Sequence, residues 1–205
     1  MEKLSVNREP GSPMPNKTRH LLPALLVAIS VAAIGFATLL MMRGTPTRPL
    51  IGGPFRLVAQ DGRTVTDKDF LGAPFLVFFG YTHCPDVCPT TLFQVSEVLR
   101  ALGPNANVKA LFITVDPERD TPAVLKEYVS SFDSRVIGLS GDRPSIDAAE
   151  RAYRVYAKKA PGQNGEYTYD HTALVYLMDK TGSFAGAFNV EGKPDEAAAQ
   201  LRRFM

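Results

Sequence analysis

The hydrophobic residues of the chain fall into one long N-terminal run and a series of short ones. The long run, Leu21–Met42, holds 22 residues and no charged side chain. At about 1.5 Å per residue, a helix of this length crosses the hydrocarbon core of a membrane. The run is too long for the core of a signal peptide, and the residues at its end, Met41-Met42-Arg43, offer no small-residue cleavage site. The pattern therefore predicts one uncleaved transmembrane helix.

The shorter runs follow the periods of strands and helices. Apolar or alternating stretches bounded by turn residues predict seven strands, at 55–58, 64–66, 75–79, 108–115, 136–139, 172–178 and 183–188. Apolar positions at steps of three and four, with capping residues and prolines at their starts, predict helices at 90–102, from Pro122, across 146–156 and from Pro194 to 203. Residues 161–167 are polar and Gly-rich, which is typical of a loop.

The order of these elements predicts the fold class and the domains. Strands that alternate with helices indicate an α/β domain with helices on both faces of its sheet, and we place this domain at residues 53–205. Residues 1–20 are polar and Pro-rich and are expected to form a disordered cytoplasmic tail. Residues 43–52 contain two prolines and two glycines, which indicates a linker.

Charge predicts the orientation in the membrane. The residues before the long hydrophobic run carry an excess of two positive charges, which equals the net charge of +2 of the whole chain. The positive-inside rule then places the N-terminus in the cytoplasm and the domain in the periplasm, with a single pass through the inner (cytoplasmic) membrane, or through the mitochondrial inner membrane in a eukaryote. The domain itself is neutral and has no basic excess that would favour nucleic-acid binding.

Both cysteines of the chain lie between a predicted strand and a predicted helix. Cys84 and Cys88 are four residues apart and follow the apolar stretch 75–79, which Gly80 ends. The N-terminus of a helix lowers the pKa of a thiol and favours the thiolate, which is both a redox nucleophile and a metal ligand. A disulfide across four residues would close too short a loop to add much stability, so the spacing favours a site. Two inert thiols or a plain disulfide are the alternative.

His171 is the candidate for a third functional side chain. It immediately precedes an apolar stretch that could lie beside the strand ending at the cysteines, although a lone histidine more often has a structural role. The adjacent Asp170 is a candidate partner for its ring. His83 is a minor candidate because successive side chains diverge, and His20 abuts the membrane helix.

An acidic loop, residues 116–120, follows the predicted strand 108–115. Ligands of open α/β sheets bind at the carboxyl ends of strands, so Asp116 and its neighbours are expected close to the cysteines, with a capped and solvated loop as the alternative. Two thiolates and one imidazole suit a soft, three-coordinate ion. This set favours Cu(I), or Cu(II) if water or a carboxylate completes it, while zinc remains a competitor on ligand type.

Three separated motifs resemble those of the Sco/SenC family. They are the segments 78–90, 115–121 and 170–172, and the resemblance extends over about residues 52–205. It implies a thioredoxin-like α/β fold in a membrane-tethered domain outside the cytoplasmic membrane or in the mitochondrial intermembrane space. It also implies copper binding, with Cys84, Cys88 and His171 as the metal ligands.

The resemblance further implies a function. A member of this family is expected to be a copper metallochaperone that helps to assemble the copper A centre in subunit II of cytochrome c oxidase, with another copper chaperone as a candidate donor. The alternative is a thiol-disulfide oxidoreductase that reduces the cysteine pair of that subunit, with Cys84 and Cys88 as its redox-active pair. Their spacing differs from the Cys-x-x-Cys of efficient catalysts. A thiol peroxidase would need threonine where this chain has Tyr81.

Overall fold

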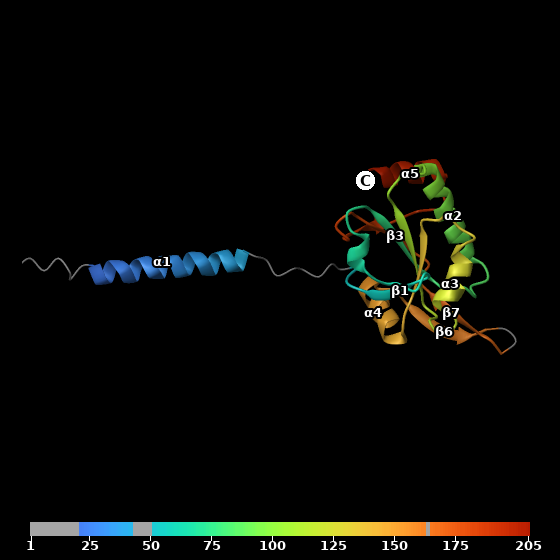
Figure 1. Cartoon of the computed structure of the whole chain (residues 1–205), viewed down its shortest axis with the longest axis horizontal. Helices are drawn as coiled ribbons and strands as arrows, with labels where there is room; N and C mark the ends of the chain where they lie inside the picture. The colour runs from blue at the N-terminus through green and yellow to red at the C-terminus, as the bar shows by residue number, and fades with distance from the viewer. Residues whose placement is uncertain (1–20, 43–50, 163–164) are drawn as a thin grey trace, which may run out of the picture. The chain divides into compact units, whose positions relative to one another are not determined.

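The computed structural model describes residues 21–42, 51–162 and 165–205, which belong to two compact units, Met1–Thr47 and Arg48–Met205 (Figure 1). The described residues of the first unit form helix α1 (Leu21–Met42). No helix within the described ranges has the length and hydrophobicity that crossing a membrane requires, so the predicted transmembrane helix is not confirmed. The predicted tail 1–20 and positions 43–50 of the predicted linker lie outside the described residues.

The second unit is built on a seven-stranded sheet with the order β2-β1-β5-β4-β3-β8-β9. Its strands are β1 (Arg56–Ala59), β2 (Thr64–Thr66), β3 (Phe75–Gly80), β4 (Lys109–Thr114), β5 (Val136–Ser140), β8 (Val175–Met178) and β9 (Phe184–Ala187). The three central strands β3, β4 and β5 are parallel, whereas β8 and β1 pair with them in the antiparallel sense. All seven strands predicted from the hydrophobic pattern are present, and the predicted pairing of β8 beside β3 is confirmed.

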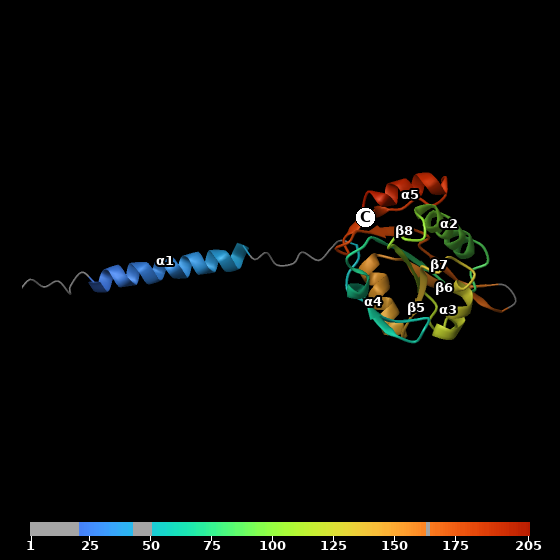
Figure 2. The same ribbon diagram turned by 45° about the horizontal axis from the view of Figure 1, so that its top comes forward.

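Helices cover both faces of this sheet, as predicted. One core contains residues of α2 (Val87–Leu102), α3 (Pro122–Val129) and α5 (Pro194–Arg202), and the other contains residues of α4 (Arg143–Tyr153). Figure 2 shows α2 and α5 side by side, away from α4. The β3 side chains alternate between the two cores, so Phe78 packs in one and Phe79 in the other. Strand β3 is buried along its whole length, which explains its uninterrupted apolar sequence.

A second sheet differs from the prediction. Strands β6 (Ala157–Pro161) and β7 (Tyr167–His171) form an antiparallel hairpin of their own, and the sequence pattern predicted neither strand, although the predicted loop 161–167 spans the connection between them. Helix α4 ends at Tyr153 because Arg154 adopts the left-handed conformation (φ 57°), so Tyr156 lies outside the helix and is exposed. Strand β8 starts at Val175, three residues later than predicted.

Candidate metal centre

The cysteines occupy the connection from β3 to α2. Cys84 lies in the connecting loop and is partly exposed, whereas Cys88 lies in the first turn of α2 and is buried. The backbone N–H of Cys88 donates to the Cys84 sulfur over 3.4 Å, and the N–H of Cys84 donates to the carbonyl oxygen of Tyr81 over 3.2 Å. The unpaired amides at the start of a helix thus face one of the two sulfurs, as the sequence predicted.

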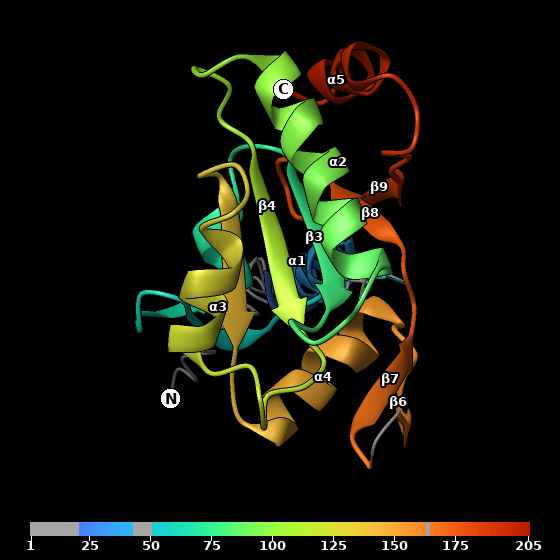
Figure 3. The same ribbon diagram turned by 90° about the vertical axis from the view of Figure 1, so that its right-hand side faces the viewer.

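His171, the last residue of β7, lies beside both sulfurs. Its Nε2 is 3.5 Å from the Cys88 sulfur. One ligand atom from each of Cys84, Cys88 and His171 lies within 4.8 Å of the other two, and this is the one such cluster of metal-ligating side chains in the part of the chain that the structure describes. Figure 3 shows that β3 and β4 point toward the region of the β6–β7 hairpin. The structure therefore brings together the three residues that the sequence singled out.

The ring of His171 is held in one orientation. Its Nδ1 lies 3.0 Å from the carbonyl oxygen of Thr172, and a carbonyl can only accept, so Nδ1 donates to it and Nε2 is the ring nitrogen that faces Cys88. The rings of Tyr81 and Phe78 pack edge-on against the imidazole. Asp170, predicted as the partner of this ring, is exposed, and the backbone of Thr172 takes that position instead.

The two thiols differ in acidity. The hydrogen bond from the Cys88 thiol holds the pKa of Cys84 far below its usual range, and the backbone N–H groups of Asp86 and Cys88 act in the same direction. The same hydrogen bond, together with burial, raises the pKa of Cys88. Cys84 is therefore the more acidic thiol of the pair.

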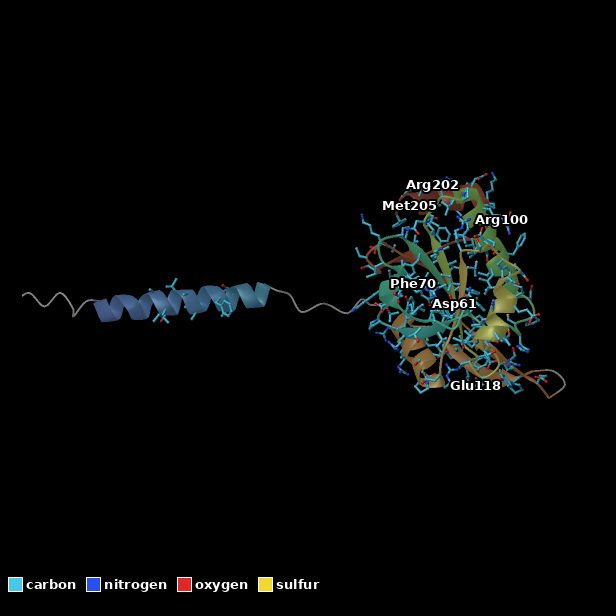
Figure 4. All side chains as sticks on the ribbon, in the orientation of Figure 1. Asp61, Phe70, Arg100, Glu118, Arg202 and Met205 are labelled. Carbon is cyan, nitrogen blue, oxygen red and sulfur yellow. The ribbon has the colours of Figure 1, made fainter. Side chains whose placement is uncertain are left out.

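The acidic loop lies against the cysteine loop, as predicted for the carboxyl ends of β3 and β4. Asp116 and Asp120 are fully buried, so the alternative of a solvated loop is wrong for these two carboxylates, whereas Glu118 between them is exposed at the periphery (Figure 4). Asp116 pairs with Arg119 and accepts a hydrogen bond of 3.0 Å from the hydroxyl of Tyr167 on β7. Burial raises the pKa of Asp120.

Sequence reasoning missed the role of Tyr81. Its hydroxyl lies 2.5 Å from that of Thr168 and accepts from the backbone N–H of Tyr169 over 3.4 Å. The buried Tyr81 side chain thus connects the start of the cysteine loop to β7, which carries His171. The alternation of Tyr167, Tyr169 and His171 along β7 is a strand signal, but no local pattern pairs this strand with Tyr81. His83 is exposed and lies outside the cluster, and His20 is outside the described residues.

Comparisons with known proteins identify the family of the chain. The family model described as SCO1/SenC matches residues 43–205. The SCO2-like protein of Rickettsia felis is 32% identical over 198 residues, which cover 89% of this chain and 97% of that protein. The human protein described as "Protein SCO1 homolog, mitochondrial" is 41% identical over 162 residues, which cover 77% of this chain and 54% of the human protein. The chain thus spans about half the length of that relative.

Solved structures extend the similarity to the fold. Bradyrhizobium japonicum ScoI with copper bound is 60% identical, with a TM-score of 0.73, over 76% of this chain and 99% of that one. Yeast Sco1 with copper bound is 35% identical, with a TM-score of 0.68, over 77% and 91%. The expected thioredoxin-like α/β fold is confirmed by these matches. The chain belongs to the SCO1/SenC family.

Proposed function

We propose that this protein is a copper metallochaperone that holds one copper ion through Cys84, Cys88 and His171. The observation that carries this proposal is the mutual approach of their three ligand atoms to within 4.8 Å. Two sulfurs and one imidazole nitrogen form a soft donor set that suits Cu(I), while structural zinc sites use four protein ligands. The copper bound to the two similar solved structures supports the same metal.

Delivery of the metal to a partner fits the burial of the three ligands. Cys84 is partly exposed and is the more acidic thiol, so the thiolates of a partner can reach the metal from that side. Cys88 is buried behind it. We propose subunit II of cytochrome c oxidase as the recipient, which would receive copper for its copper A centre by exchange of thiolate ligands, and another copper chaperone as the donor.

A second function is favoured by the reduced pair of thiols. The Cys84 thiolate could attack a disulfide of subunit II and form a mixed disulfide, and Cys88 would then displace the partner's sulfur. The balance of this reaction is one disulfide between Cys84 and Cys88 and two thiols on the partner. This thiol-disulfide oxidoreductase requires both cysteines and does not require His171.

Two parallel reactions with the copper-binding domain of subunit II separate these functions. In the first, the Cu(I)-loaded chain is mixed anaerobically with the reduced, metal-free domain, and the copper content of each protein is measured after separation. In the second, the reduced, metal-free chain is mixed with the oxidised domain, and the partner's free thiols are counted. We expect copper transfer in the first reaction, and its loss in His171→Ala. The oxidoreductase would be favoured if copper stays on the chain in the first reaction and if the wild type and His171→Ala both reduce the subunit II domain efficiently in the second.

We also propose that residues 21–42 anchor the protein in the inner (cytoplasmic) membrane, or in the mitochondrial inner membrane in a eukaryotic cell, with the domain on the side opposite the cytoplasm or matrix. The absence of charged residues from this segment and the positive excess before it support this proposal. We expect the full chain to stay in the membrane pellet after alkaline extraction, and a chain without residues 1–42 to be soluble. Extraction of the full chain at alkaline pH would contradict the anchor.

A further inference from the structure

A buried carboxylate ties the cysteine loop to the strand beside it. Asp120 accepts three hydrogen bonds, from the backbone N–H of Thr82 over 3.0 Å, from the Thr82 hydroxyl over 2.6 Å and from the Thr114 hydroxyl over 2.6 Å. Two of these donors belong to the residue that stands two positions before Cys84. The third belongs to the end of β4, which is part of the central sheet.

The burial of Asp120 carries an energetic cost that these hydrogen bonds offset. Its side chain is fully buried, and among the described residues no ion pair reaches it, so neutral hydrogen-bond donors alone satisfy the carboxylate. Taking a carboxylate out of water is unfavourable unless hydrogen bonds satisfy its oxygens. An apolar side chain at this position would avoid the cost but could not hold the N–H of Thr82.

Cys84 depends on this tie more than the other two ligands do. Cys88 is fixed by helix α2, and His171 is fixed by the carbonyl of Thr172 and the rings beside it. Cys84 is the one ligand that stands on a loop, between the end of β3 and the start of α2. Its own backbone N–H is held by the carbonyl of Tyr81, the neighbour of Thr82.

We infer that Asp120 is a positioning residue that holds Cys84 in its ligand position through Thr82 before any metal is bound. This inference rests on the proposed copper site and adds a residue that does not contact the metal. Groups that orient metal ligands typically change metal affinity by about 10–100-fold when they are replaced. The effect of Asp120 is thus expected on copper affinity beyond its effect on stability.

The experiment compares four variants of the full chain. Asp120→Asn removes the charge, and Thr82→Val removes one donor at nearly constant volume, while Thr82→Ser restores the hydroxyl. Ser140→Ala is the matched control, because the buried Ser140 hydroxyl donates over 2.7 Å to the backbone carbonyl of Asp120 and not to its carboxylate. Amide hydrogen exchange of the metal-free protein, the free energy of unfolding and the Cu(I) affinity against a competing chelator are measured for each.

We expect Cu(I) affinity to fall at least about tenfold in Asp120→Asn and Thr82→Val, with faster exchange at the amides of Thr82 and Cys84. Thr82→Ser is expected to stay within about twofold of the wild type, and Ser140→Ala to lose stability alone. If Asp120→Asn does not fold, the comparison of Cu(I) affinity between Thr82→Val and Thr82→Ser tests the inference.

Two outcomes would overturn the inference. The first is unchanged Cu(I) affinity in Thr82→Val and Asp120→Asn, and the second is an equal loss of affinity in Ser140→Ala at equal loss of stability. A wild-type chain without Cu(I) affinity would instead reject the proposed function. In that case the amide hydrogen exchange of Cys84 still tests whether Asp120 holds the cysteine loop. An unchanged exchange rate in Asp120→Asn would show that the carboxylate does not hold it.

Discussion

Replacing His171 with alanine is expected to lower the Cu(I) affinity by more than about a hundredfold, since it removes one of three ligands outright. The Nε2 of His171 lies 3.5 Å from the Cys88 sulfur, and no other histidine belongs to the cluster within the described ranges. The measurement is an anaerobic titration of the reduced chain with Cu(I) in the presence of a competing chelator. The wild type is expected to take up one tight equivalent.

Two further variants make this result specific. Cys84→Ser is expected to lose affinity to a similar extent, because it removes the more acidic thiol of the pair. His83→Ala is the comparison for loss of an imidazole that is not a ligand: His83 is exposed and outside the cluster, and its Nδ1 lies 3.0 Å from the Thr82 hydroxyl, so we expect a far smaller loss of affinity than in His171→Ala. Wild-type copper binding in His171→Ala would reject the three-ligand site and leave thiol-disulfide chemistry as the better reading. A repeat with Zn²⁺ tests the competing metal.

Gly80→Ala is expected to damage both the core and the metal centre. A Cβ atom at Gly80, the last residue of β3, would lie 2.7 Å from the Cys88 sulfur and 2.7 Å from a ring carbon of Phe112. Both neighbours are buried, so one of them must move. Overpacking of this kind costs about 1–3 kcal/mol of unfolding free energy. We expect a loss of this size by denaturant unfolding, and at least about tenfold weaker Cu(I) binding because Cys88 is displaced.

Gly138→Ala separates the two effects. Gly138 is a second strand glycine, and a Cβ atom there would lie 3.1 Å from the Cβ of Leu125 on α3, away from the cysteines. We expect this variant to lose stability while its copper affinity stays at the wild-type value. If Gly80→Ala kept wild-type affinity, or if both variants weakened copper binding equally, the contact between Gly80 and Cys88 would have no role in the metal centre.

The sequence predicts the part of the site that local patterns encode. An uninterrupted apolar strand, a glycine at its end and a helical stripe beyond it place Cys84 and Cys88 at a strand–helix junction. Strand β8 beside β3 also follows from its apolar sequence. This pairing puts His171, four residues before β8, near that junction.

The remaining features depend on contacts that no local pattern records. Strands β6 and β7 contain no fully buried residue, and the adjacent Lys158 and Lys159 interrupt any alternation along β6, so β6 lacks the pattern that identifies a strand with one buried face. Asp120 and Thr82 are 38 residues apart, and their hydrogen bonds become visible only when the two loops meet. The sequence predicted Asp170 as the partner of the His171 ring, whereas the structure places the Thr172 carbonyl there. Every residue has a backbone carbonyl, so the sequence could not single this one out.

The hairpin that ends at His171 belongs to a separate two-stranded sheet, while both thiols are attached to the central one. Hydrogen bonds from Tyr81 and Tyr167 join that hairpin to the rest of the domain. Withdrawal of the imidazole would therefore break side-chain contacts and leave every backbone pair of the central sheet intact. The fold thereby holds the two thiols and the imidazole on separate sheets. In the proposed copper site, the imidazole would leave a bound ion while both sulfurs stay on the connection from β3 to α2, and the ion would pass from three ligands to two without the loss of a backbone hydrogen bond in the central sheet.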